Sequence, residues 1–306
     1  MRIVFAGTPD LAIPGITALI EAGHEIVGII TRADAPLGRK RILTPSPVAE
    51  YANTHSIPVF KANTLAEEAT SWVENLNADL GVVIAYGGLL KTPMLNATKN
   101  GWINLHFSEL PKWRGAAPVQ RALIAGETNL AVTVFRLVEA LDAGEIVATD
   151  KWDITPGTSA GEALNFLAQV GAETLLKAVD EIANDPTAGE AQTGDATYAH
   201  KLSRVDGKLD FTRKSTEVVA HWAGVTPEPG AWALVDGQSI KIHSIKFLKN
   251  PSGIQLEPGE ATLLENVVIV GTGDAELIIE RVQPAGKQTM DAVAWIHGKN
   301  GKATLS

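Results

Sequence analysis

Residues 101–121 read GWINLHFSELPKWRGAAPVQR, a stretch that combines a strand, a proline-bounded loop and the start of a helix. In the strand-like part, Asn104 and His106 lie two residues apart and therefore on the same face. An amide and an imidazole that converge at the end of a strand can together hold the oxygen of a reacting carbonyl. A third polar group is needed to orient the imidazole, and Asp142 in the later segment LDAGE is the candidate.

Short apolar strands alternate with helical patterns through the first half of the chain. The predicted strands are residues 2–6, 25–31, 79–85 and 101–106, and the predicted helices are residues 10–22, 46–55, 64–77 and 116–125. Segments 131–137 and 146–154 predict a further pair of strands. Such alternation is typical of an α/β domain with a Rossmann-like, largely parallel central sheet.

The pattern changes in the second half of the chain. Residues 158–184 predict one long amphipathic helix, and residues 185–207 are rich in Gly, Ala, Thr and Asp, which indicates a linker. Short β-like runs follow at 231–235, 240–248, 267–271 and 276–282, separated by Gly and Pro. We therefore expect a larger domain over residues 1–184, a linker over 185–207 and a small β-barrel over 208–306.

Composition limits the classes of function. The 306 residues suffice for two domains, and the absence of Cys excludes disulfides and thiolate chemistry and suits a reducing cytoplasm. The apolar run at the start, MRIVFAG, is better explained as a first strand than as a signal peptide, and no apolar run is long enough to span a membrane. With a net charge of −9, any nucleic-acid binding must come from a local patch, and Arg39-Lys40-Arg41 is the densest.

Several motifs argue against other activities. Gly7-Thr8-Pro9 stands where a dinucleotide fold carries its glycine fingerprint but lacks G-x-G-x-x-G, so no nicotinamide cofactor is expected. Residues 157–161 match the hydrolase motif G-x-S-x-G, although Ser159 followed by Glu162 is better read as a capping box for the long helix. The seven histidines are scattered, so no metal is expected.

The candidate residues suit acyl transfer to an amine. Sites in open α/β sheets form outside the carboxyl ends of the strands, where we expect both His106 and Asp142 to lie. When an amine attacks a carbonyl, negative charge develops on the oxygen and a proton must leave the nitrogen. Asn104 and a charged His106 can hold that oxygen, while Asp142 orients the imidazole or receives the proton.

Segments along the whole chain resemble the formyltransferases that use 10-formyltetrahydrofolate, above all those that act on methionyl-tRNA. The resembling segments are FAGTPD (5–10), RADAPLGRKRILTPSPV (32–48), AYGGLL (85–90), the stretch 101–121, YAHKLSRVDGKLDF (198–211), PEPGAWA (227–233) and VQPAGKQTM (282–290). They follow one another in the family's order.

The resemblance implies a reaction and roles for particular residues. The formyl group passes from 10-formyltetrahydrofolate, a co-substrate consumed at each turnover, to the α-amino group of initiator methionyl-tRNA, which supports translation initiation. It implies a cytoplasmic monomer with an OB-like, tRNA-binding C-terminal barrel. The implied residues are the catalytic trio Asn104, His106 and Asp142, the folate loop Ser108, Glu109, Leu110 and Pro111, and the tRNA-contacting Arg39, Lys40 and Arg41.

One departure from the family pattern lies in the folate loop, because Glu109 stands where the family usually has Leu. Two rival functions remain beside the hydrolase interpretation of Ser159. A formyltransferase of the same fold acting on a small amine would need neither the Arg39-Lys40-Arg41 loop nor the barrel. A non-catalytic RNA-binding protein would not need the trio.

Overall fold

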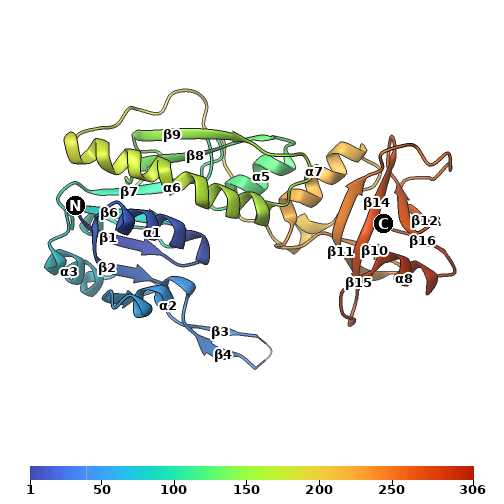
Figure 1. Cartoon of the computed structure of the whole chain (residues 1–306), viewed down its shortest axis with the longest axis horizontal. Helices are drawn as coiled ribbons and strands as arrows, with labels where there is room; N and C mark the ends of the chain where they lie inside the picture. Colours follow the sequence, from blue (N-terminus) through green and yellow to red (C-terminus); the bar gives the residue numbers. More distant parts are fainter. Residues whose placement is uncertain (39) are drawn as a thin grey trace. The chain divides into compact units, whose positions relative to one another are not determined.

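Two sheets form the framework of the computed structural model, which describes residues 1–38 and 40–306 (Figure 1). In the first sheet, the four strand pairs from β5 to β7 are parallel, and β8 is antiparallel to β7. This confirms the predicted Rossmann-like, largely parallel sheet. Its strands, in spatial order, are β5 (Val59–Lys61), β2 (Glu25–Thr31), β1 (Arg2–Gly7), β6 (Leu80–Ile84), β7 (Trp102–His106), β8 (Asn129–Arg136) and β9 (Ile146–Asp153).

Helices accompany this sheet as the alternating pattern predicted. Strands β2 and β6 are buried almost throughout, as expected where helices cover both faces of a parallel sheet. The short strand β5 and the hairpin of β3 (Ala35–Leu37) and β4 (Ile42–Thr44) were not predicted, since three residues carry little periodicity. The helices of this part of the chain are α1 (Ile13–Glu21), α2 (Pro47–Thr54), α3 (Glu67–Leu76), α4 (Thr92–Leu95), which was not predicted, α5 (Pro118–Ile124) and α6 (Ala160–Asn184). Of these, α5 belongs to the second compact unit of the chain and not to the sheet of the first.

Strand β7 is anchored at its start by Trp102. The Trp102 indole is 1% exposed, and its Nε1 donates to the Met94 carbonyl oxygen at 2.7 Å. The ring lies against Gly81 of β6 so closely that a Cβ there would come within 2.1 Å of it. A glycine is therefore required at position 81, and its contact with Trp102 fixes the strand that carries Asn104 and His106.

The second sheet consists of antiparallel strands with the order β10-β11-β14-β13-β12-β16, and β15 pairs with β14. Leu234 of β10 and Ser306, just after β16, exchange two backbone hydrogen bonds, so the sheet nearly closes on itself. This confirms the predicted C-terminal β-barrel. Its strands are β10 (Trp232–Val235), β11 (Gln238–Phe247), β12 (Glu260–Leu264), β13 (Val267–Gly271), β14 (Glu276–Pro284), β15 (Met290–Asp291) and β16 (Lys302–Thr304).

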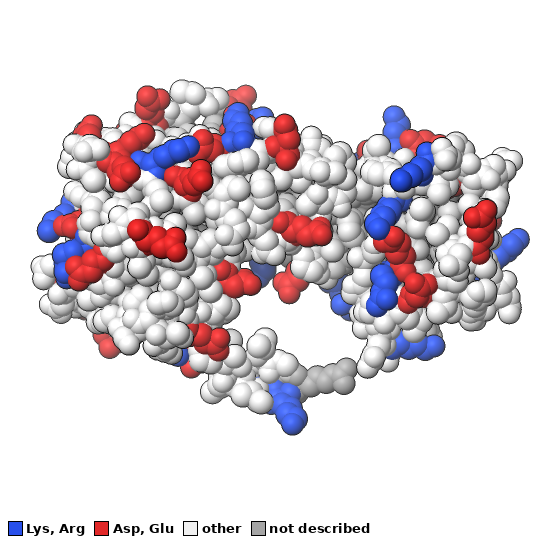
Figure 2. Space-filling view, viewed as in Figure 1, with Lys and Arg blue, Asp and Glu red and all other residues white. Residues whose placement is uncertain are grey.

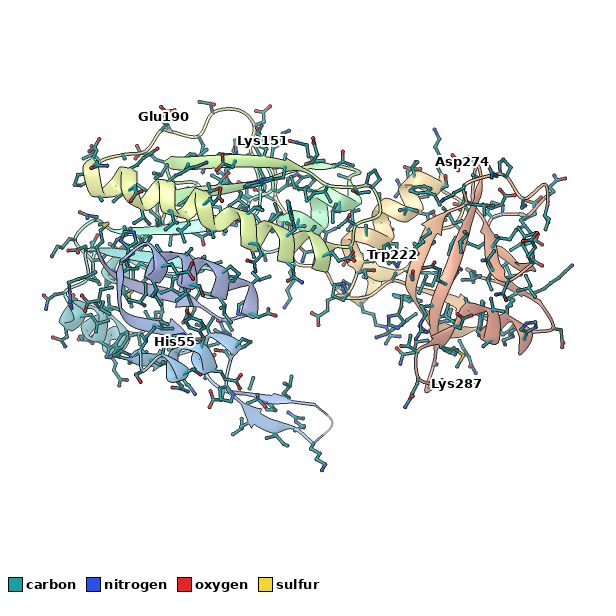
Figure 3. The ribbon with its side chains drawn as sticks, viewed as in Figure 1. His55, Lys151, Glu190, Trp222, Asp274 and Lys287 are labelled. Atoms are coloured by element: carbon teal, nitrogen blue, oxygen red, sulfur yellow. The ribbon has the colours of Figure 1, made fainter. Side chains whose placement is uncertain are left out.

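Helices α7 (Ser215–Val225) and α8 (Ala292–His297), which were not predicted, pack on the barrel. Trp222, labelled in Figure 3, is buried on α7, and its Nε1 donates to the Ile242 carbonyl oxygen of β11 at 3.0 Å. A buried indole that keeps its hydrogen bond supplies both apolar area and orientation. Trp222 therefore fixes α7 on the barrel.

The chain divides into two compact units that are discontinuous in sequence. The first unit comprises residues 1–116, 130–152 and 164–199, and the second comprises 117–129, 153–163 and 200–306. On the face shown in Figure 2, acidic and basic side chains are interspersed over each unit. Within the described residues, no helix is long and apolar enough to cross a membrane.

The Ser159–Glu162 capping box generates a stability prediction. The Glu162 carboxylate accepts from the Ser159 N–H at 2.9 Å and from its hydroxyl at 2.7 Å, while the Ser159 Oγ accepts from the Glu162 N–H. We expect Ser159→Ala to lower the free energy of urea-induced unfolding by about 1 kcal/mol, because a capping hydroxyl is lost. Ser159→Thr, which keeps the hydroxyl, is the control. Lost activity in a Ser159→Ala protein of unchanged stability would favour the nucleophile interpretation instead.

Candidate active site

Strand β7 presents Asn104 and His106 in turn. Asn104 pairs with Val83 of β6 and with Phe135 of β8, and its half-buried side-chain amide has no hydrogen-bond partner among the described residues. The His106 ring is buried and meets the Phe135 ring edge-on, with centroids 6.2 Å apart. Asn104 therefore offers an uncommitted donor beside an imidazole that is fixed by packing.

The structure brings His106 and Asp142 together, as the trio requires. His106 Nδ1 lies 3.9 Å from Asp142 Oδ2, and the two side chains are only 7% and 12% exposed. This distance exceeds that of a hydrogen bond, so the interaction is that of a charge near the ring. On the other side of the ring, His106 Nε2 lies 3.0 Å from the Trp113 carbonyl oxygen, which can only accept, so Nε2 carries the hydrogen.

Asp142 reaches His106 by a route that the sequence did not predict. Because β8 is antiparallel to β7, the end of β8 places Arg136 beside Ile103, three residues before His106. The loop after β8 must therefore turn back along β7. Asp142 adopts a left-handed conformation with φ of 47°, and its Oδ2 accepts from the Gly115 N–H at 2.7 Å. This hydrogen bond joins the loop after β8 to the loop after β7.

Burial decides the protonation of His106. Removal from water lowers the pKa of the His106 imidazole, while the Asp142 carboxylate and the hydrogen bond to Trp113 act in the opposite direction. The neutral ring is therefore favoured in the protein as it stands. A proton that arrives at Nδ1 is placed beside the Asp142 carboxylate, which stabilises the imidazolium.

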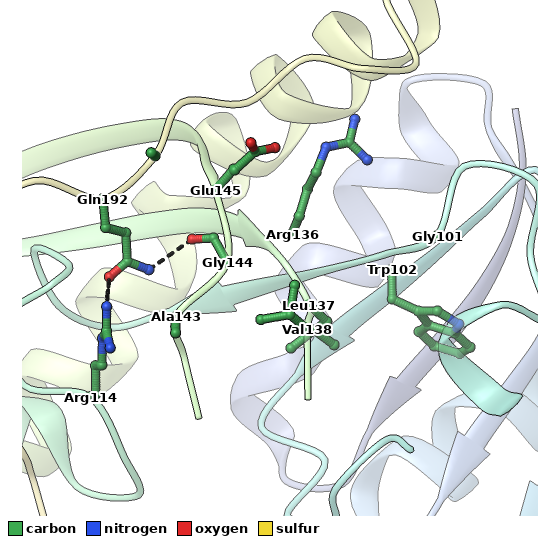
Figure 4. Close-up of a pocket in the computed structure, with 11 residues that line it drawn as sticks. Gly101, Trp102, Arg114, Arg136, Leu137, Val138, Ala143, Gly144, Glu145 and Gln192 are labelled. Atoms are coloured by element: carbon green, nitrogen blue, oxygen red, sulfur yellow. Dashed lines mark hydrogen bonds between the residues drawn. The ribbon is translucent and has the colours of Figure 1, made fainter. Parts of the chain in front are cut away.

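A residue that sequence reasoning missed links the two loops. The Gln192 Oε1 accepts from Arg114 Nε at 3.2 Å and from Arg114 Nη2 at 2.6 Å, and the Gln192 Nε2 lies 2.8 Å from both the Asp142 and the Gly144 carbonyl oxygens. Figure 4 shows Gln192 linked in this way to Arg114 and Gly144. Gln192 lies in the stretch predicted as a linker, where no periodicity or motif marked it.

A cavity of about 480 Å³ lies beside this link. Figure 4 shows Gln192 between Arg114 and Gly144 at one end of the cavity and Trp102 at the other. Arg136 donates to the carbonyl oxygens of Ala188 and Pro186, so its charge is already engaged. The residues that line the cavity are Gly101, Trp102, Arg114, Arg136, Leu137, Val138, Ala143, Gly144, Glu145, Ala191 and Gln192.

The predicted folate loop follows β7 directly. Ser108 and Leu110 are buried, and the Ser108 hydroxyl donates to the Lys112 carbonyl oxygen at 2.7 Å, so it supports the loop itself. Glu109 is 44% exposed and pairs with Lys151 of β9, which is labelled in Figure 3. Glu109, which replaces the usual Leu, thus places its carboxylate at the protein surface, where it forms an ion pair with Lys151.

The predicted tRNA-binding cluster lies elsewhere on the first unit. Arg39 lies outside the described residues, whereas Lys40 and Arg41 lie in the exposed turn between β3 and β4 (Figure 1). Leu37, Ile42 and Leu43 on this hairpin are each more than 60% exposed. The structure therefore brings His106 and Asp142 together beside β7 and carries Lys40 and Arg41 on a separate projecting hairpin.

Comparison with known proteins places the chain among formyltransferases. The formyl transferase family model matches residues 1–179, and the model of the formyl transferase C-terminal domain matches residues 201–300. The methionyl-tRNA formyltransferase of Leifsonia xyli is 49% identical over 306 residues, which cover 100% of each chain.

Two solved structures share the fold at low sequence identity. HypX from Aquifex aeolicus in complex with tetrahydrofolic acid has a TM-score of 0.69 and 15% identity, with 97% of this chain and 47% of that chain covered. The N-formyltransferase from Helicobacter canadensis, in complex with folinic acid and dTDP-3-aminofucose, has a TM-score of 0.70 and 16% identity, with 93% of this chain and 99% of that chain covered. At such identities the likeness concerns the fold alone.

The lowered pKa of His106 predicts how stability depends on pH. In the unfolded chain, histidine takes up a proton near pH 6.5, whereas buried His106 resists doing so. The unfolded state therefore binds more protons as pH falls below about 6.5, and the unfolding free energy decreases. We expect the unfolding free energy of the His106→Gln variant, measured with urea, to decrease less steeply between about pH 7 and pH 5 than that of the parent protein. Burial also lowers the pKa of His24, but His24 is present in both the variant and the parent protein, so its contribution is the same in each. If the two curves of unfolding free energy against pH are parallel, the lowered pKa does not belong to His106.

Proposed function

The chain belongs to the formyl transferase family, and on that basis we propose that it transfers the formyl group of 10-formyltetrahydrofolate to the α-amino group of initiator methionyl-tRNA. The observation that carries the proposal is the buried His106–Asp142 pair beside the uncommitted amide of Asn104. The full-length match to a relative named for this activity supports the choice of substrate.

The proposed reaction forms one bond and breaks another. The methionyl nitrogen attacks the formyl carbon, and a C–N bond forms as negative charge collects on the formyl oxygen. The amide N–H of Asn104 and the protonated His106 stabilise this oxygen. Collapse of the intermediate breaks the bond from the formyl carbon to N10 of the folate, which leaves with a proton as tetrahydrofolate. The proton lost by the amine balances the one gained at N10.

Asp142 acts through His106 in this scheme. Before substrate binds, burial favours the neutral imidazole, so Nδ1 is free to receive a proton. The Asp142 carboxylate 3.9 Å away stabilises the resulting imidazolium. Since both side chains are largely shielded from water, this attraction is stronger than it would be at the surface.

The remaining assignments extend the proposal to binding. Folate is a co-substrate held with the help of the loop Ser108, Glu109, Leu110 and Pro111, whose backbone is fixed from within by the Ser108 hydroxyl. Residues 1–184 carry catalysis, 185–207 connect, and the barrel of 208–306 contributes to tRNA binding. Arg39, Lys40 and Arg41 contact the tRNA. We propose that the protein works as a monomer in the cytoplasm, in support of translation initiation.

The test of the reaction is formyl transfer from 10-formyltetrahydrofolate, with charged initiator methionyl-tRNA compared with free methionine. We expect transfer to the tRNA-bound amine only. His106→Ala should reduce kcat by about 10²–10³-fold because an oxyanion donor is lost. Its tRNA affinity and unfolding transition should change little.

His55→Ala, at an exposed histidine on the first unit, is the matched control for that variant. Unchanged kinetics in His106→Ala would remove His106 from the mechanism. Transfer to a small amine but not to the tRNA would refute the proposed acceptor.

A second test concerns the hairpin. Changing Arg39, Lys40 and Arg41 together to Gln should weaken tRNA binding and reduce the slope of log affinity against log salt concentration by up to about 3, since each lost phosphate contact removes about 1. Folate binding should not change. The control variant removes the same charge from the first unit at Lys61, Lys99 and Lys177, three exposed or half-exposed lysines. Equal slopes in the two variants would show that the hairpin makes no phosphate contacts.

A further inference from the structure

We infer that Gln192 is a positioning residue for the reaction, because its side-chain amide ties the loop that carries Asp142 to the loop that carries Trp113 and Gly115. The inference rests on the proposed function, since it concerns the residues assigned there to formyl transfer. Gln192 contacts none of the reacting atoms in this scheme. It acts through the spacing between His106 and Asp142.

The hydrogen bonds of Gln192 use both ends of its amide. Its Oε1 accepts from two nitrogens of Arg114, and its Nε2 donates to the carbonyl oxygens of Asp142 and Gly144. Only a side-chain amide combines an acceptor with two donors in this way. A Glu at this position would keep the acceptor for Arg114 but would set a carboxylate against two carbonyl oxygens.

The two loops that Gln192 joins are the ones that meet at Asp142. Gly115, next to Arg114 in the chain, donates its N–H to Asp142 Oδ2 at 2.7 Å. Gly144 lies so close to Arg136 that a Cβ there would come within 1.8 Å of the Arg136 carbonyl oxygen. The turn over residues 142–144 is therefore held between β8 on one side and Gln192 on the other.

The same arrangement determines the surroundings of His106. Trp113 accepts from His106 Nε2, and Asp142 faces Nδ1, so the ring lies between the two loops that Gln192 ties together. A shift of one loop relative to the other alters the 3.9 Å separation between His106 and Asp142. Asp142 is the charged group that acts on the ring, whereas the Arg114 guanidinium is held on the Gln192 amide.

The backbone that carries Gln192 is itself fixed to the first unit. Glu190 exchanges backbone hydrogen bonds with Ile146 of β9, and the Arg114 N–H donates to the Thr197 carbonyl oxygen at 2.8 Å. The Ala199 N–H in turn donates to the Arg114 carbonyl oxygen at 2.7 Å. These main-chain hydrogen bonds fix the backbone on both sides of Gln192, so its side-chain amide can hold the two loops in a defined relative position.

The test uses Gln192→Met, which keeps the length of the side chain and removes its hydrogen bonds. We expect kcat to fall about 10–100-fold, the loss typical of a supporting partner behind a reactive group, with KM for folate and for tRNA within about twofold of the parent values. The midpoint for His106 protonation, followed by NMR without substrates, should move to lower pH because Asp142 is no longer held close to the ring.

Two further variants complete the design. Gln192→Glu retains the contact with Arg114 and should reproduce the loss of kcat, which also covers the case in which Gln192→Met does not fold. Asn184→Leu is the matched control, since the Asn184 amide also donates to a main-chain carbonyl oxygen, that of Asp180, but at the end of α6. It should leave kcat and the His106 midpoint unchanged.

A purely stabilising role is the alternative. If the Gln192 variants lower the melting temperature while kcat and the His106 midpoint stay at the parent values, the inference is overturned. A change confined to KM would overturn it as well. The NMR titration needs no substrate, so it judges the inference even if the parent protein transfers no formyl group to methionyl-tRNA, a result that would refute the proposed function alone.

Discussion

The hydrogen bond from the Gly115 N–H to the Asp142 carboxylate is the contact on which the site depends. It joins two loops that leave the sheet at different places, because β8 runs antiparallel to β7 and ends beside Ile103. Without such a hydrogen bond, nothing in the direction of β8 would hold the loop that follows it close to His106. The left-handed conformation of Asp142 is tolerated because the surrounding hydrogen bonds hold it.

The electrostatics of the site follow from this tie. An imidazole and a carboxylate that are both largely buried would be costly as isolated charges. Here the carboxylate receives a backbone N–H and the imidazole donates to a backbone carbonyl, so the main chain satisfies both groups. The neutral ring with a carboxylate nearby can accept a proton at Nδ1 with little rearrangement.

The sequence predicted much of the framework from local signals. Apolar runs and helical periodicity located β1, β2, β6, β7 and α6 within a residue or two, because their lengths give a clear pattern. The short strand β5 and the β3–β4 hairpin were not predicted, since strands of three residues are too short to show a period. Asn104 and His106 were predicted to share a face from spacing alone, whereas Asp142 was placed at the same sheet edge for a reason that the antiparallel β8 does not support.

The sequence by itself determined the residue types and their local conformation: the strand that presents Asn104 and His106, the Ser159–Glu162 capping box, the barrel and the family pattern. Only the tertiary structure decided which distant groups meet. Gln192 lies 50 residues from Asp142 and 78 from Arg114, in a segment without periodicity, and no pattern in the chain predicts its hydrogen bonds. Periodicity reports how one segment faces the core, whereas contacts between loops depend on strand order and direction, which the folded chain alone specifies.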